Sequence, residues 1–180
     1  CNDWSTSTKA FEVSYAIETI MDECRMNPIQ FVDGEFKELE PHANQKVVQY
    51  SEPVGPQVSW NITHSELGTV PVSFRDKGLK QCTYSIGFPD EMAERLEFLH
   101  QLGFSSREPL EVDGVEVKPV RVLKKLMDIM PDDPNAVIND CDIIKTVVTG
   151  TKDGQKIEYT LESVCRPVKW WPELMGAQVY

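Results

Sequence analysis

A compact charged group in the first quarter of the chain is the first candidate for ligand binding. Asp22, Glu23 and Arg25 surround Cys24, in a segment that predicts a short helix. Carboxylates bind an ammonium group and a guanidinium binds a carboxylate, so this group has the chemistry to hold an amino acid. The alternative is a solvated helix end without a ligand. The residues alone leave both interpretations open.

A second candidate is the segment from His64 to Thr69, which follows a predicted strand and predicts a loop. Ligand-binding groups concentrate in such loops. An imidazole, which titrates near neutral pH, can donate a hydrogen bond to a carboxylate, and Ser65 and Thr69 add two hydroxyls. Tyr84, in a later strand, can line the same pocket or pack in the core. An ordinary polar loop is the alternative reading of the whole segment.

No catalytic or metal-binding motif accompanies these groups. Nothing places a nucleophile beside a base and an orienting residue. The five cysteines are widely spaced and form no C-x-x-C pair, which predicts reduced thiols rather than disulfides. The three histidines form no H-x-x-H or H-E-x-x-H group, so no zinc site is predicted.

Charge and length exclude several classes of protein. The 180 residues include 18 Lys and Arg against 29 Asp and Glu, a formal net charge of −11, and predict one domain. An acidic chain is a poor ligand for nucleic acid or for an anionic membrane surface, so neither is an expected partner. No apolar run is long enough to span a bilayer, and no secretion signal is visible. We therefore expect a cytoplasmic location.

The glycines exclude a nucleotide-phosphate loop within the chain. No two of the ten glycines stand one residue apart, so G-x-G-x-x-G is absent, and no G-x-x-x-x-G-K-[ST] occurs.

Hydrophobic periodicity predicts the elements that must position the candidate residues. Alternation predicts strands over 11–15, 29–31, 36–39, 45–50, 58–62, 81–86, 144–149 and 155–163. One helix is predicted over 90–102, with Met92, Leu96 and Leu99 on one face. A second begins at Pro119. Its predicted inward residues are Val120, Leu123, Leu126, Met127 and Met130.

Strands that come in runs favour an α+β fold, with a mixed, largely antiparallel sheet and helices on one face. One face of such a sheet stays exposed to solvent in part unless a partner covers it. Near the end of the chain, Trp170 and Trp171 form a large apolar pair that belongs either to an interface or to the core. The chain starts with Cys1 and ends in a mildly apolar run, which suggests a part excised from a longer protein.

Four segments carry, in order, a resemblance to a known family. They are 13–23 (VSYAIETIMDE), 67–71 (LGTVP), 83–89 (TYSIGFP) with the helix ending QLGF at 101–104, and 114–126 with the hairpin over 149–159. From about Phe11 to Cys165 the chain resembles the C-terminal, substrate-binding and dimerisation domain of the saccharopine dehydrogenase family. That family includes saccharopine reductases, lysine 6-dehydrogenases and carboxynorspermidine dehydrogenases. The implied fold is similar to the C-terminal domain of glyceraldehyde-3-phosphate-dehydrogenase-like enzymes.

The resemblance implies that residues 1–180 are a single substrate-binding and dimerisation domain, without the Rossmann domain of a longer dehydrogenase. That enzyme would be an NAD(P)-dependent oxidoreductase acting on the C–N bond of an amino acid or amino-acid adduct of the saccharopine or lysine type. NAD or NADP would bind outside this fragment, which alone would be inactive. Its implied partners are a small amino-acid substrate, its own Rossmann domain and a second subunit of a homodimer. The predicted substrate-binding residues are Glu23, His64, Ser65, Thr69 and Tyr84.

The chain departs from the family's pattern at two places. Tyr15-Ala16 stands where the family has Trp-Ser, and Tyr84 or Ser85 occupies the place of an arginine. That arginine would be a natural bidentate partner for an amino-acid carboxylate. Its absence favours an alternative, a non-catalytic dimerisation or partner-binding module with a decayed substrate pocket.

Overall fold

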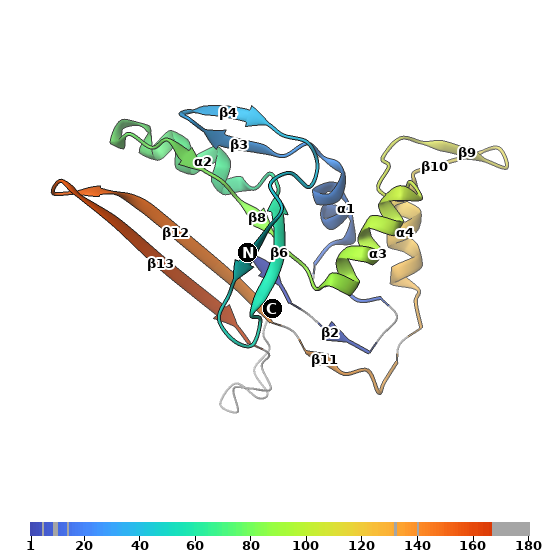
Figure 1. Ribbon diagram of the computed structural model, residues 1–180. Coiled ribbons are helices and arrows are strands. Elements are labelled where there is room, and N and C mark those ends of the chain that lie inside the picture. The colour runs from blue at the N-terminus through green and yellow to red at the C-terminus, as the bar shows by residue number, and fades with distance from the viewer. Residues whose placement is uncertain (5, 9–10, 14, 132, 140, 167–180) are drawn as a thin grey trace.

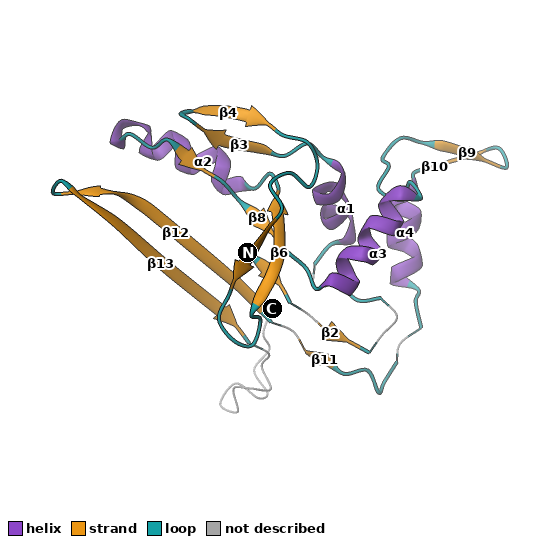
Figure 2. Ribbon diagram, in the orientation of Figure 1, coloured by secondary structure: helices purple, strands orange, loops and turns teal. Residues whose placement is uncertain are grey.

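Four helices and a set of short antiparallel strands make up the described residues of the computed structural model, 1–4, 6–8, 11–13, 15–131, 133–139 and 141–166 (Figure 2). The helices are α1 (Ile17–Arg25), α2 (Ser65–Phe74), α3 (Asp90–Gln101) and α4 (Pro119–Asp128), with a 3-10 turn η1 over Arg75–Lys77. The first strands are β1 (Asn2–Asp3), β2 (Thr6–Ser7), β3 (Ile29–Val32), β4 (Glu35–Glu38), β5 (Lys46–Gln49), β6 (Pro56–Asn61), β7 (Gln81–Cys82) and β8 (Ser85–Ile86). The later strands are β9 (Leu110–Val112), β10 (Val115–Val117), β11 (Ile138–Asn139), β12 (Asp142–Lys152) and β13 (Gln155–Cys165).

The predicted α+β class is confirmed. Three sheets have three strands, in the orders β1-β12-β13, β4-β3-β7 and β5-β6-β8, and the pairs β9–β10 and β2–β11 complete the set among the described residues. All of these pairings are antiparallel. The helices α1, α3 and α4 lie together on one side of β6 and β8 (Figure 1).

The core forms where these three helices meet β6 and β8. Ile20 and Met21 of α1, Leu96 of α3, Val120 of α4 and Trp60 of β6 belong to one buried cluster. The predicted inward face of α3 is confirmed, because Met92 and Leu99 also pack against this cluster. Burying such a side chain fully stabilises the fold by roughly 1.5–3 kcal/mol.

The inward face predicted for the second helix is confirmed for three of its five residues, and Met130 lies beyond the end of α4 at Asp128. Val120 and Leu123 are buried and Met127 packs beside them, but the Leu126 side chain is 51% exposed. A helix advances 100° per residue, so Leu126 lies well off the stripe formed by the other three. The helix α4 therefore meets the core through a narrow face.

Two predicted strands are not formed as expected. Residues 11–13 and 15 have no strand partner in the described structure; Phe11, Val13 and Tyr15 instead pack partly against the helical core before α1. The strand predicted over 81–86 is broken into β7 and β8, which join different sheets. Thr83 and Tyr84 connect them, so Tyr84 lies at the switch between two sheets.

The predicted loop from His64 to Thr69 is also wrong, because α2 begins at Ser65. His64 is extended and precedes the first helical residue. Leu67 and Pro71, one helical turn apart, are the buried residues of α2, and the helix contacts β3 and β7. Gly68 and Pro71 are poor helix formers, but packing of this face outweighs that local propensity.

A long hairpin extends from the body of the molecule (Figure 1). Its strands β12 and β13 have 11 residues each and pair from Asp142–Cys165 at the base to Lys152–Gln155 at the tip. Asp153 and Gly154 in the turn have positive φ angles of 53° and 78°, as a two-residue type I′ turn requires. The hairpin prediction is thus confirmed, with longer strands than expected.

Candidate functional site

The helix α1 holds the Glu23 carboxylate at the margin of the core. Ile17, Ile20, Met21 and Cys24 share its buried face, which leaves Glu23 half-buried beside it. The hydroxyl of Tyr15 donates a hydrogen bond to Glu23 Oε2 over 2.5 Å. Burial raises the pKa of Glu23, against the opposing effects of the Tyr15 hydrogen bond and the nearby His64. Glu23 is therefore a carboxylate with little solvent around it.

His64 and Tyr84 form an aromatic pair close enough to Glu23 for each ring to interact with its charge. Their rings stack with centroids 4.1 Å apart and planes 7° from parallel. Burial, followed by the negative charges of Glu66 and Glu23, raises the pKa of the Tyr84 hydroxyl, which stays protonated. Three of the predicted site residues, from α1, the start of α2 and the β7–β8 connection, are thus brought together.

The backbone of Tyr84 is held by two buried amides that sequence reasoning missed. Gln30 Oε1 accepts a hydrogen bond from the Tyr84 amide over 2.8 Å, and Asn61 Nδ2 donates to the Tyr84 carbonyl over 3.1 Å. Gln30 Nε2 also donates to the Ile62 carbonyl over 2.7 Å. Gln30 is 0% and Asn61 4% exposed. Buried amides of this kind are satisfied only in one arrangement, so they position Tyr84.

Asn61 also corrects the predicted pattern of its strand. The alternation of Val58, Trp60 and Ile62 predicts that Ser59 and Asn61 face solvent, yet both are buried and Val58 is 38% exposed. Both faces of β6 are covered. Trp60 packs in the helical core on one face, and on the other face Ser59 lies 3.4 Å from the hydroxyl of Tyr50, which belongs to a second, smaller core. A buried polar residue on such a strand must find partners, and Asn61 finds them at the site.

Glu66 is a second carboxylate of the site that no prediction named. It lies in the first turn of α2, and its Oε2 contacts His64 Nδ1 and accepts a hydrogen bond from Ser65 Oγ over 3.0 Å. Burial is the largest single influence on Glu66 and raises its pKa, but the hydrogen bonds from His64, from its own backbone amide and from Ser65 together outweigh burial and lower that pKa. The sequence feature that could have drawn attention to Glu66 is its acidic side chain in the first turn of a helix, where the helix dipole favours negative charge.

Ser65 and Thr69 do not face the site in the same way. Ser65 reaches it only through Glu66. The Thr69 hydroxyl lies near the Ser65 and Glu66 carbonyls of its own helix, at 3.4 and 3.3 Å, and Thr69 is exposed. The structure thus leaves Thr69 outside the cluster, because the helix turns its side chain back onto the backbone.

The charged group around Cys24 is divided by the helix. Arg107 makes a two-pronged ion pair with Asp22, at 3.1 and 2.6 Å, and Arg25 lies 3.4 Å from the same carboxylate. The side-chain hydrogen bond from Arg107 is the largest cause that lowers the pKa of Asp22. Burial raises the pKa of the Cys24 thiol to about 12. Only Glu23 of this group points to the site.

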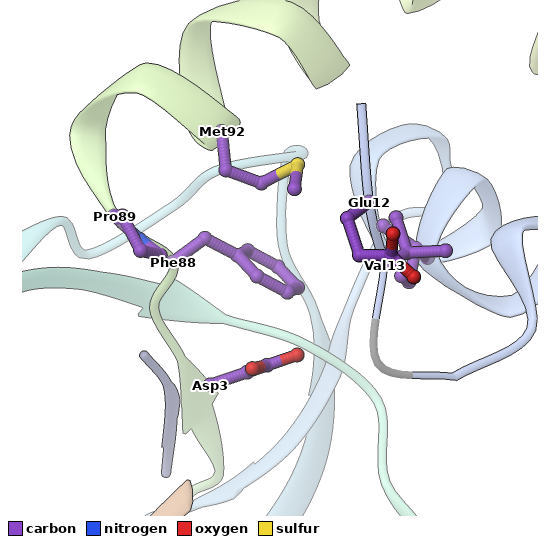
Figure 3. Close-up of a pocket in the computed structure, with 7 residues that line it drawn as sticks. Asp3, Glu12, Val13, Phe88, Pro89 and Met92 are labelled. Carbon is purple, nitrogen blue, oxygen red and sulfur yellow. The ribbon is translucent and has the colours of Figure 1, made fainter. Parts of the chain in front are cut away.

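A small cavity lies on another side of α1 (Figure 3). Its lining is mostly apolar, from Phe88, Pro89 and Met92 together with Val13, and the carboxylates of Asp3 and Glu12 border it. None of the predicted site residues lines this cavity. It is connected to the site only by charge, because Asp3 contributes to the raised pKa of Glu23.

The cluster formed by Glu23, Glu66, His64 and Tyr84 has the chemistry of an amine-binding site. Two carboxylates and the faces of two rings attract a cation, and a hydroxyl and an imidazole provide hydrogen bonds. Within the described residues no Lys or Arg hydrogen-bonds to these four side chains, and no group of His, Cys, Asp and Glu could hold a metal ion. The predicted Trp170 and Trp171 pair, and Ser14 of the family-like segment, lie outside the described residues.

The comparisons with known proteins find a fold relative. No family model matches the chain, and no curated protein does. Among solved structures, the fold is similar to that of apo saccharopine dehydrogenase (L-Glu forming) from Saccharomyces cerevisiae. The TM-score is 0.58 at 11% sequence identity, over 91% of this chain and 52% of that protein. The chain therefore shares a fold with a saccharopine dehydrogenase and spans about half its length.

No helix in the described part of the chain combines the length and the apolar character that crossing a membrane would need.

Proposed function

We propose that this chain is the substrate-binding and dimerisation domain of an NAD(P)-dependent oxidoreductase that acts on the C–N bond of an amino acid or amino-acid adduct. The observation that carries the proposal is the pairing of a dehydrogenase fold, over 91% of the chain, with the Glu23–His64–Glu66–Tyr84 cluster. One fold can host many functions, so the proposal depends mainly on the cluster. Its excess of negative charge suits the amine of a lysine- or saccharopine-type substrate.

The residues of this chain do not fit a dinucleotide. The pyrophosphate of NAD or NADP needs a glycine-rich turn between a strand and a helix, and no two glycines here are spaced for it. The nicotinamide belongs to a Rossmann domain outside these 180 residues. The domain itself binds and orients the substrate. On its own it should not turn over lysine or saccharopine with either cofactor.

The roles of the residues follow from their surroundings. Glu23 and Glu66 hold the cationic amine, and the stacked rings of His64 and Tyr84 form a flat wall against the substrate's aliphatic stem. Tyr15 restrains Glu23 through its hydroxyl, and Gln30 and Asn61 restrain Tyr84. Each contact made by a charged group in such a site contributes about 1.5–3 kcal/mol.

Binding of amines to the isolated chain tests this role. L-lysine should shift the backbone NMR signals of residues around Glu23, His64 and Tyr84, whereas L-norleucine, which keeps the α-amine and the carbon chain but lacks the side-chain amine, should not. The Glu23→Gln variant should weaken lysine binding by about tenfold or more, which is the scale of one charge-assisted hydrogen bond. Glu18→Gln is the matched control, because Glu18 lies on the same helix and pairs with Arg121 at 3.1 Å instead.

A second candidate function is a non-catalytic dimerisation or partner-binding module with a decayed pocket. The observation that favours it is the absence of an arginine at Tyr84 and Ser85, so that no described cation hydrogen-bonds to the cluster to clamp a substrate carboxylate. If lysine, saccharopine and carboxylated polyamines all leave the spectra unchanged, the amine site is refuted and this module becomes the better interpretation.

A further inference from the structure

The strand β13 presents a long free edge. In its sheet the strand order is β1-β12-β13, so β13 is the outermost strand, and no other described strand pairs with it along its 11 residues. Such an edge carries a row of backbone donors and acceptors that another strand can use. Edge strands are ordinarily short, covered by another segment or interrupted by proline, whereas β13 has 11 residues and contains no proline.

The two faces of the hairpin differ in character. The register places Ile144, Val148, Tyr159 and Leu161 on one face, where their side chains are 50%, 52%, 53% and 61% exposed. Lys145 and Glu162 pair on the other face at 2.9 Å. An exposed apolar row of this kind is typical of a surface that a partner extends or covers.

We infer that the partner at this edge is a second copy of the same chain, with the two β13 strands paired antiparallel and Tyr159 on the two-fold axis. The inference rests on the proposed function only in that it locates the dimerisation role. A two-fold axis perpendicular to the sheet keeps each side chain on its own face, so only registers that pair residues of the same face are allowed. The result is one four-stranded sheet, β12-β13-β13-β12.

Among the registers that pair at least seven residues of β13, charge complementarity selects the one centred on Tyr159. In it, Lys156 lies opposite Glu162 of the second copy, and Ile157 lies opposite its Leu161. By symmetry each of these contacts occurs twice. Centring on Thr160 instead places Glu158 opposite Glu162 twice, and centring on Glu158 places that carboxylate against itself. Opposite charges and apolar pairs stabilise an antiparallel pair, whereas like charges directly across destabilise it.

Lys156 is available for this contact. It is exposed, and within the described residues it makes no ion pair of its own. Its neighbour across the hairpin is Thr151, which is uncharged. Glu162 is held in place by Lys145 and by the hydroxyl and amide of Ser51. A fixed carboxylate on one copy thus meets a free ammonium on the other.

A charge reversal in β13 tests the register. The wild-type chain should sediment as a dimer, and Lys156→Glu should weaken dimerisation by about tenfold or more, since two attractive pairs become repulsive. Lys152→Glu is the matched control, because it makes the same change in the same hairpin but lies on β12, away from the edge. A monomeric wild type, or equal effects of the two variants, would overturn the inference.

A cross-link tests the two-fold axis directly. In a Cys165→Ser background, Tyr159→Cys should form an intermolecular disulfide on mild oxidation, because opposed residues in an antiparallel pair lie about 5 Å apart. Thr160→Cys should not, because its two copies are offset along the strands. A dimer that cross-links at neither position leaves the dimerisation role standing but refutes this edge. Lysine binding, measured separately, reports on the substrate role, so the two failures are distinguishable.

Discussion

At the scale of single residues, the site is governed by the burial of Glu23. Its carboxylate lies among Tyr15, His64 and Asp3, and burial raises its pKa despite the hydrogen bond from Tyr15. A group with a raised pKa in the folded state binds its proton more tightly there than in the unfolded chain. Its ionisation therefore reduces stability as the pH rises above the ordinary glutamate value of 4.5.

Because ionisation of Glu23 reduces the stability of the fold, the effect of Glu23→Gln on stability should depend on pH. The variant keeps an acceptor for the Tyr15 hydroxyl but carries no charge, so it should be more stable than the wild type at about pH 7. The gain should shrink and vanish as the pH falls through the raised pKa and then below 4.5. Urea unfolding midpoints of both proteins across that range measure it.

Tyr15→Phe provides the opposite control. It removes the one hydrogen bond that favours the ionised form of Glu23, so it should lose more stability at neutral pH than in acid. If Glu23→Gln is instead less stable than the wild type at neutral pH, the contacts of the carboxylate outweigh its burial and the assignment of a desolvated carboxylate fails.

At the scale of elements, the strands β1, β6 and β8 approach one another around Gly87. The Gly87 amide donates to the Cys1 carbonyl and its own carbonyl accepts from the Asp3 amide, both over 3.1 Å. A methyl group at this position would lie 2.5 Å from the Val58 carbonyl oxygen and 2.6 Å from Asn2 Nδ2. Only a residue without a side chain permits this crossing.

We therefore expect Gly87→Ala to lower the free energy of unfolding by about 2–3 kcal/mol, the usual effect of overpacking a closed site. Gly68→Ala is the control: it lies in α2, and a methyl group there meets nothing within 4 Å. That change should raise stability by up to about 1 kcal/mol, because alanine loses less conformational entropy in a helix. Similar urea midpoints for the two variants would contradict the close approach.

At the scale of the whole molecule, the chain divides into a body and a projecting hairpin (Figure 1). The body holds the main core around α1, α3 and α4, while the base of the hairpin has a small core of its own, formed by Tyr50, Val54, Cys141 and Ile143. The side-chain contacts of the hairpin with residues 49–52 are at Lys145 and Glu162, near its base. The outer part of the hairpin therefore has no role in the core.

Shortening the hairpin tests this division. Replacing residues 148–159 with an Asn-Gly turn should change the free energy of unfolding by less than about 1 kcal/mol, since it removes residues that are exposed apart from the partly buried Ile157 and leaves both cores intact. In contrast, Ile143→Ala, at a side chain 0% exposed, should lower it by about 2–5 kcal/mol. A shortened protein that fails to fold would show that the hairpin is part of the body. A shortened protein that still dimerises would contradict the β13 edge.

Local patterns in the sequence were sufficient for most of the elements. Met92, Leu96 and Leu99 repeat at the helical period, and Pro119 begins α4 as predicted. The turn pairs Asp33-Gly34 and Asp153-Gly154 end strands where a positive φ is needed. These signals act between residues two to four positions apart, so they are readable without knowing which faces meet.

Long-range packing alone decided the site. The sequence makes Glu23, His64 and Tyr84 candidates, but nothing local indicates that their three elements converge or that Thr69 turns away. In the sequence, Gln30 of β3 and Asn61 of β6 look like solvent-facing residues of ordinary strands, yet the fold buries both. Sequence periodicity determined which side of each element is apolar. Only the tertiary structure decided which polar groups would be trapped between those sides, because a buried polar group takes its partners from whatever the fold brings within hydrogen-bond distance.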